Sequence, residues 1–188
     1  MDSFQQLEQD LHFVRTAVER ADSDPTPRHL CFLWAAIALV GFALVDLRDA
    51  WVPIYWAVAG PAGFVLSAAI GWLHSRRRGQ PASAIGARHL LHWGALVTTA
   101  FLAWLMPVQG VMSWTGIGPT ILLLLALGYF QAGVHFDPAF RWIGLVLAFG
   151  YVFVLFVDAY AWLTLGVLFA VALVIVGLRS SPQHGNTL

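Results

Sequence analysis

Residues 89–136 read HLLHWGALVTTAFLAWLMPVQGVMSWTGIGPTILLLLALGYFQAGVHF, and none of them is Asp, Glu, Lys or Arg. A membrane-spanning helix needs about 20 predominantly apolar residues, so this stretch is too long for a single span. Pro107, Gln109 and Gly110 begin a polar, glycine-rich break near its middle that ends at Pro119. Because such residues are typical of turns, we expect two helices, over residues 89–106 and 118–136.

Four further charge-free runs complete the pattern. They cover residues 30–45, 50–75, 142–157 and 159–178 and predict helices near 29–47, 52–74, 139–157 and 160–178. Only helices and closed barrels satisfy backbone polar groups in lipid, and these apolar runs are continuous rather than alternating. We therefore expect an all-α, polytopic membrane helix bundle, with six transmembrane helices arranged as three consecutive hairpins.

The composition agrees with a membrane protein. Hydrophobic residues make up 59% of the 188 residues and charged residues only 11%, whereas soluble domains are about 25% charged. Ten basic residues balance ten acidic ones, so a nucleic-acid partner, which requires a basic surface, is not expected. The single cysteine, Cys31, excludes an internal disulfide framework and CxxC metal or redox motifs.

Residues 1–27 have a different character. An apolar stripe recurs at spacings of three and four, which predicts an amphipathic cytoplasmic helix; its members are Phe4, Leu7, Leu11, Val14 and Val18. The segment carries six acids against two arginines, a net charge of −4, whereas helices that lie on membranes usually have a basic polar face. Docking on protein is therefore favoured, either on a partner or on a second copy through residues 4–21.

The arginines predict the orientation. Nine of the ten fall on one side of the expected membrane and only Arg48 on the other, so the positive-inside rule places both termini in the cytoplasm. The absence of lysine is typical of GC-rich bacterial genomes, which indicates the bacterial inner membrane. The chain divides into residues 1–27, a bundle over 28–179 and a cytoplasmic tail over 180–188. The residues expected to contact anionic lipid or the acidic N-terminal helix are Arg28, Arg76, Arg77, Arg78, Arg88 and Arg141.

Small residues at four-residue spacing predict helix contacts, since they let backbones approach closely in lipid. Three such sets occur, on three different spans: Gly63, Ser67 and Gly71; Gly144 and Ala148; Gly166 and Ala170. The same faces could also form the contact between two copies of the chain.

Two alternative sites follow from the polar residues. Imidazoles at the cytoplasmic ends of the spans could hold a transition metal or a haem; these are His29, His89, His92 and His135. A neutral or amphipathic solute could bind along the second span and its neighbours, at Trp56, Pro61, Ser67, Thr98 and Gln131. No charged residue lies at mid-depth in a span, which disfavours ion-coupled transport.

The leading hypothesis is a non-catalytic integral membrane protein that acts through protein partners, with the N-terminal helix as its interaction or regulatory element. The alternative is a permease or substrate-binding membrane subunit for a small solute, and metal or haem binding is the third reading. No catalytic signature such as Gly-x-Ser-x-Gly occurs, so we expect neither an enzyme nor a resident cofactor.

Overall fold

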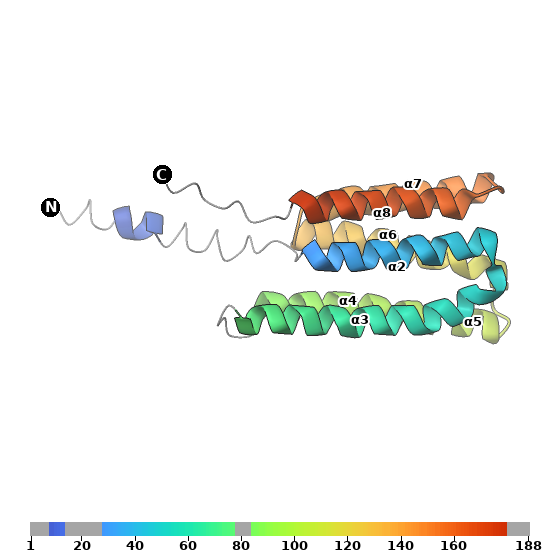
Figure 1. The fold of residues 1–188 in the computed structure, drawn as a ribbon, viewed down its shortest axis with the longest axis horizontal. Coiled ribbons are helices and arrows are strands. Elements are labelled where there is room, and N and C mark those ends of the chain that lie inside the picture. Colours follow the sequence, from blue (N-terminus) through green and yellow to red (C-terminus); the bar gives the residue numbers. More distant parts are fainter. Residues whose placement is uncertain (1–7, 14–27, 78–83, 180–188) are drawn as a thin grey trace.

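Six long helices run side by side along one axis of the protein (Figure 1). The structure is a computed structural model that describes residues 8–13, 28–77 and 84–179. The predicted tail over 180–188 and most of the predicted N-terminal helix lie outside the described residues. The long helices are α2 (Arg28–Leu47), α3 (Val52–Arg77), α4 (Ala84–Ala103), α6 (Trp114–His135), α7 (Ala139–Phe156) and α8 (Ala161–Arg179); two short elements, η1 (Asp49–Trp51) and α5 (Leu105–Val108), join them.

All six long helices, two of them (α3 and α4) together with neighbouring residues, form segments long and apolar enough to cross a membrane, which confirms the predicted number of spans and the all-α bundle. Successive helices reverse direction, so the described chain starts and finishes at the same end (Figure 1). We call this the inner end; it carries Arg28, Arg76, Arg88, Arg141 and Arg179. The opposite end, which we call the outer end, carries Arg48 and the turn at Gly110.

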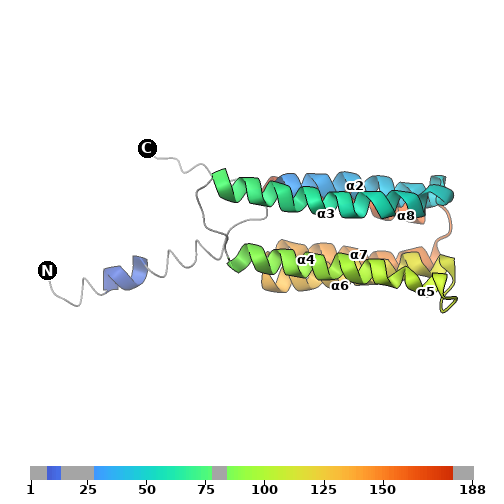
Figure 2. The ribbon, with the colours of Figure 1, turned by 90° about the horizontal axis from the view of Figure 1, so that it is seen from below.

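The helices are stacked in three layers of two. In Figure 1, α7 and α8 form one outer layer, α2 and α6 the middle one, and α3 and α4 the other outer layer. Figure 2 shows the same array turned, with α3, α2 and α8 on one side and α4, α6 and α7 on the other. The two closest helix pairs are α2 with α8 and α6 with α7. The α2–α8 pair brings the first and the last of the long helices together.

Glycines make the close α2–α8 contact. A Cβ added at Gly166 would lie 2.7 Å from Cβ of Phe42, and one at Gly177 would lie 3.0 Å from Cβ of Cys31. Close backbone approach of this kind maximises van der Waals contact where lipid offers no hydrophobic driving force. The predicted contact at Gly166 is thereby confirmed, and it brings α8 against the first span.

The α6–α7 pair is closer still. A Cβ at Gly144 would lie 2.6 Å from the backbone nitrogen of Phe130, and one at Gly133 would overlap Arg141. Both clashes involve backbone atoms, which cannot rotate away as a side chain can. Gly144 was among the predicted contacts; Gly133 was not, because no small residue stands four positions from it on the same face.

The layer formed by α3 and α4 is much less enclosed than the rest. Only 6% of the residues in the most apolar stretch of each of these two helices are buried, compared with 39% in α6 and 44% in α8. Within this layer Gly63 does pack on α2, since a Cβ built there would lie 2.7 Å from Ile37 and 3.2 Å from Trp34. At Gly71, no atom lies within 4 Å of a Cβ built there, so the described residues give no support to the predicted close helix contact at this position.

Two predicted helix boundaries need correction. The fourth span begins at Trp114 rather than at 118, because the Ser113 side chain accepts a hydrogen bond from the backbone N–H of Gly116 and caps the helix earlier. The third span begins at Ala84 rather than at 89, and it is interrupted at Trp104 before α5. The helix therefore includes Arg88 in its second turn, although the charge-free run that predicted this span begins only at His89.

Candidate functional site

Aromatic rings fill the centre of the bundle. The Phe42 ring on α2 lies 6.3 Å from Trp56 on α3 and 6.0 Å from Phe169 on α8, centroid to centroid. Phe169 in turn lies 5.3 Å from Tyr129 on α6. These separations are typical of stabilising aromatic pairs. Apart from Tyr129, no described residue with a polar side chain is buried, so the core is apolar packing rather than a polar cavity.

At the inner end the series of rings includes two of the predicted histidines. The Phe136 ring lies 3.9 Å from the His89 ring and 5.4 Å from the His92 ring, between centroids. Nε2 of His92 lies 3.0 Å from the carbonyl oxygen of Gly128. With its proton on Nε2, His92 donates a hydrogen bond to that carbonyl and ties α4 to α6.

The other two histidines of the predicted metal or haem site, His29 and His135, are exposed. Among the described residues, no three His, Cys, Asp or Glu side chains come together as a metal site. His92 uses Nε2, one of its two ring nitrogens, on Gly128. The described contacts give His89 a role in ring packing and His92 a role in both ring packing and helix contact.

The residues predicted for a solute site serve different parts of the bundle. Trp56 packs against Phe42 in the core, and Pro61 lies within α3, which continues through it. Thr98 on α4 and Gln131 on α6 are exposed. In the described part of the chain, no hydrogen bond or ring contact joins any two of the five predicted residues.

Ser67, the fifth of them, has a structural partner. Its hydroxyl accepts a hydrogen bond from the Trp34 indole at 3.0 Å and donates one to the carbonyl oxygen of Gly63 at 2.7 Å. The Trp34 contact links α3 to α2. Both roles of the hydroxyl are thus occupied within the protein, as is common for serine in membrane helices.

The predicted basic surface is present at the inner end. Arg28, Arg76, Arg88 and Arg141 are exposed, and the guanidinium of Arg76 lies 3.9 Å from the centre of the Trp72 ring. Asp137, the acid nearest to Arg141 in sequence, accepts a hydrogen bond from the backbone N–H of Ala139, the first residue of α7. Arg78 lies outside the described residues, and so does the side chain of Arg77.

The N-terminal segment is described only from Glu8 to Phe13, which is helical. Figures 1 and 2 both show this turn beyond the inner end of the bundle. Leu11, a member of the predicted stripe, is 62% exposed, and Phe13 is 75% exposed. The expected contact of the acidic helix with the basic surface stays a prediction, because most of that helix lies outside the described residues. Phe4, Leu7, Val14 and Val18 lie outside the described residues.

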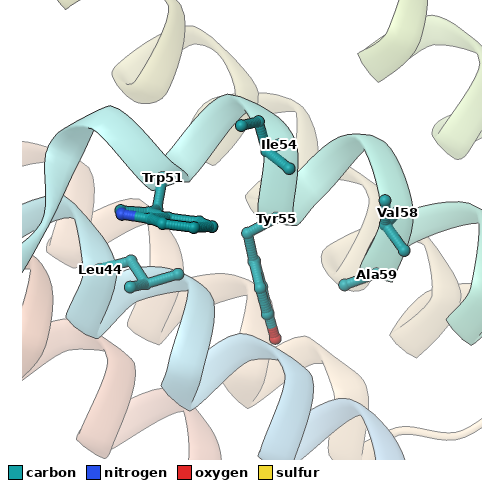
Figure 3. Close-up of a pocket in the computed structure, with 6 residues that line it drawn as sticks. All are labelled: Leu44, Trp51, Ile54, Tyr55, Val58 and Ala59. Atoms are coloured by element: carbon teal, nitrogen blue, oxygen red, sulfur yellow. The ribbon is translucent and has the colours of Figure 1, made fainter.

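A feature that the sequence did not predict is an apolar groove near the outer end, shown in Figure 3. It has a volume of about 390 Å³, and its lining comes from the end of α2, from η1 and from the first two turns of α3: Leu44, Trp51, Ile54, Tyr55, Val58 and Ala59. Ile54 with Val58 and Tyr55 with Ala59 stand at i and i+4, which was a signal for one shared helix face. That α2 leaves this face open could not be known from the spacing.

Comparison with known proteins adds no further assignment: no protein-family model matches the chain, and neither the curated proteins nor the solved structures include a match to it.

Proposed function

We propose that this chain is a non-catalytic membrane protein that acts through a protein partner, which its N-terminal amphipathic helix engages. The helix lies on the cytoplasmic side of the bacterial inner membrane in this proposal, because the inner end carries most of the arginines and the positive-inside rule assigns that end to the cytoplasm.

The observation that carries the proposal is the exposure of Leu11. It belongs to the apolar stripe of residues 4–18, and 62% of its surface is open on a helical turn beyond the inner end. An amphipathic helix gains most of its stability by burying its apolar face. A helix shorter than three heptads needs a partner that covers its apolar stripe. Apolar residues at spacings of three and four are typical of helices that dock into a groove on another protein.

Charge suggests the chemistry of the partner surface. Residues 1–27 have a net charge of −4, so a complementary surface has an apolar groove with basic residues at its rim. An anionic lipid surface would repel the same segment, which favours protein over membrane as the occupant.

The polar groups of the bundle support a non-catalytic role. Trp34 and Ser67 bind each other across α2 and α3, and His92 binds the Gly128 carbonyl across α4 and α6. The Tyr55 hydroxyl donates to the carbonyl oxygen of Ile37 at 2.7 Å. These groups hold helices together, which suits a bundle that anchors an interaction element.

The test compares two truncations of the tagged protein expressed in its bacterial host. Deletion of residues 1–24 is expected to abolish the complex, measured as the mass of the native assembly in mild detergent, while the thermal unfolding midpoint of the bundle stays unchanged. Deletion of residues 180–188 is the matched control at the other terminus and is expected to leave the complex intact. An assembly of unchanged mass after the N-terminal deletion would refute the proposal.

A further inference from the structure

The groove at the outer end is apolar along its whole length. Tyr55 is the only lining residue with a hydroxyl, and that hydroxyl donates to the Ile37 carbonyl of α2. Figure 3 shows the Tyr55 side chain directed from α3 toward α2, so that its ring forms a wall. A site without free hydrogen-bonding groups accepts hydrocarbon and excludes polar solutes, because an unpaired polar group would lose its hydration there.

The groove opens away from the bundle. Trp51, Ile54 and Val58 are 61%, 60% and 65% exposed, and all lie in the apolar segment from Asp49 to Leu73 that can cross a membrane. In a bilayer this opening faces the hydrocarbon of one leaflet. The occupant with direct access is therefore an acyl chain of the membrane itself.

Its dimensions suit one such chain. From Trp51 to Ala59 the groove follows α3 for about 12 Å at 1.5 Å per residue, and one leaflet contributes about 15 Å of hydrocarbon. The volume of about 390 Å³ holds roughly a dozen groups of the size of a water molecule, to which a methylene is similar.

The backbone of Arg48 lies beside the groove, next to two of its lining residues. The backbone N–H of Arg48 donates to the carbonyl oxygen of Leu44 at 2.8 Å, and its own carbonyl accepts from Trp51 at 2.9 Å. Arg48 thus lies between two lining residues, and its side chain is exposed. The neighbouring Asp49 carboxylate accepts a hydrogen bond from the backbone N–H of Ala50, within the short helix η1. Arginine pairs well with phosphate, and tryptophan prefers the headgroup level.

We infer that this groove is a phospholipid site, in which one acyl chain lies between α2 and α3 and the phosphate meets Arg48. The site takes its ligand from the leaflet at the outer end, at the opposite side of the bundle from the proposed partner helix. Its existence is independent of the proposed function.

The test uses vesicles of phosphatidylethanolamine and phosphatidylglycerol that contain a trace of phosphatidylethanolamine with a photoactivatable diazirine in the middle of one acyl chain. After illumination, labelled peptides are mapped by mass spectrometry. The expected label concentrates on Leu44, Ile54 and Val58. Ala59→Leu fills the groove and is expected to lower that labelling roughly tenfold, whereas Ala57→Leu, an exposed position on the same helix outside the lining, leaves it unchanged.

A second pair of variants tests the phosphate contact. Arg48→Gln is expected to lower the labelling, and Arg179→Gln at the inner end is not. If Ala59→Leu does not fold by circular dichroism, Val58→Trp replaces it, because that side chain is largely exposed. Labelling spread evenly over exposed residues, or equal labelling in the Ala59 and Ala57 variants, would each overturn the inference.

Discussion

A carboxylate oxygen of Asp46 accepts a hydrogen bond from the backbone N–H of Leu163 at 2.7 Å, across 117 positions of sequence. Leu163 lies in the first turn of α8, where backbone N–H groups have no partner within the helix. Asp46, in the last turn of α2, therefore caps a helix to which it does not belong. Its negative charge also faces the positive end of the α8 dipole, which strengthens one of the two closest helix pairs of the bundle.

Loss of this cap should be measurable. We expect Asp46→Ala to lower the free energy of unfolding by about 1 kcal/mol, the usual cost of losing an N-cap. Asp46→Asn keeps an acceptor and loses only the charge, so its effect should be smaller. Thermal unfolding in detergent gives the comparison, and Asp158→Ala, an exposed acid at the same end, is the control. Equal stability of the Ala variant and the unaltered protein would show that the cap contributes nothing.

The contact between Trp34 and Ser67 is suited to a double-mutant cycle. Trp34→Phe removes the indole N–H and Ser67→Ala removes its acceptor. We expect a coupling energy of about 0.6 kcal/mol, the average for hydrogen bonds between membrane helices. The readout is reversible unfolding of the single and double variants. Strictly additive effects would mean that the two side chains contribute through packing alone.

Two glycine-to-alanine substitutions should have opposite effects. At Gly144 the added Cβ meets the backbone of Phe130, so Gly144→Ala must separate α6 from α7 and should cost about 1 to 3 kcal/mol. At Gly71 the Cβ meets nothing, and alanine should be neutral or stabilise the helix by about 0.5 to 1 kcal/mol. Unfolding midpoints of the two variants test this difference. A Gly144→Ala variant as stable as Gly71→Ala would contradict the described contact.

Cysteine labelling tests the orientation. Cys31 is the only cysteine of the sequence and is 3% exposed. Labelling of an introduced cysteine can therefore be detected with little background from Cys31. On intact inner-membrane vesicles of right-side-out orientation, a membrane-impermeant maleimide should label Gln109→Cys at the outer end. It should label Ala87→Cys only after the vesicles are opened. The reverse pattern would place the arginines outside and overturn the predicted topology.

Sequence predicted the spans because each depends on local composition. Charge-free length located all six helices, and small residues indicated the contacts at Gly63, Gly144 and Gly166. The pairing of α2 with α8 was not predictable, since periodicity tells which face of a helix is apolar or small but not which distant helix meets it. The predicted solute residues fared less well for a related reason: a polar residue such as Ser67 has the same sequence pattern whether its partner is a ligand or Trp34.

The proposed partner contact is tested most directly by two substitutions on the same described helical turn. Leu11→Asp places a charge in the apolar stripe, while Gln9→Asp adds the same charge at an exposed position outside the stripe. The measurement is the native mass of the assembly isolated in mild detergent, as a function of protein concentration. We predict that Leu11→Asp weakens the complex at least roughly tenfold, as expected for loss of an apolar anchor, and that Gln9→Asp leaves it unchanged. Assemblies of the same mass and concentration dependence in both variants would contradict the account.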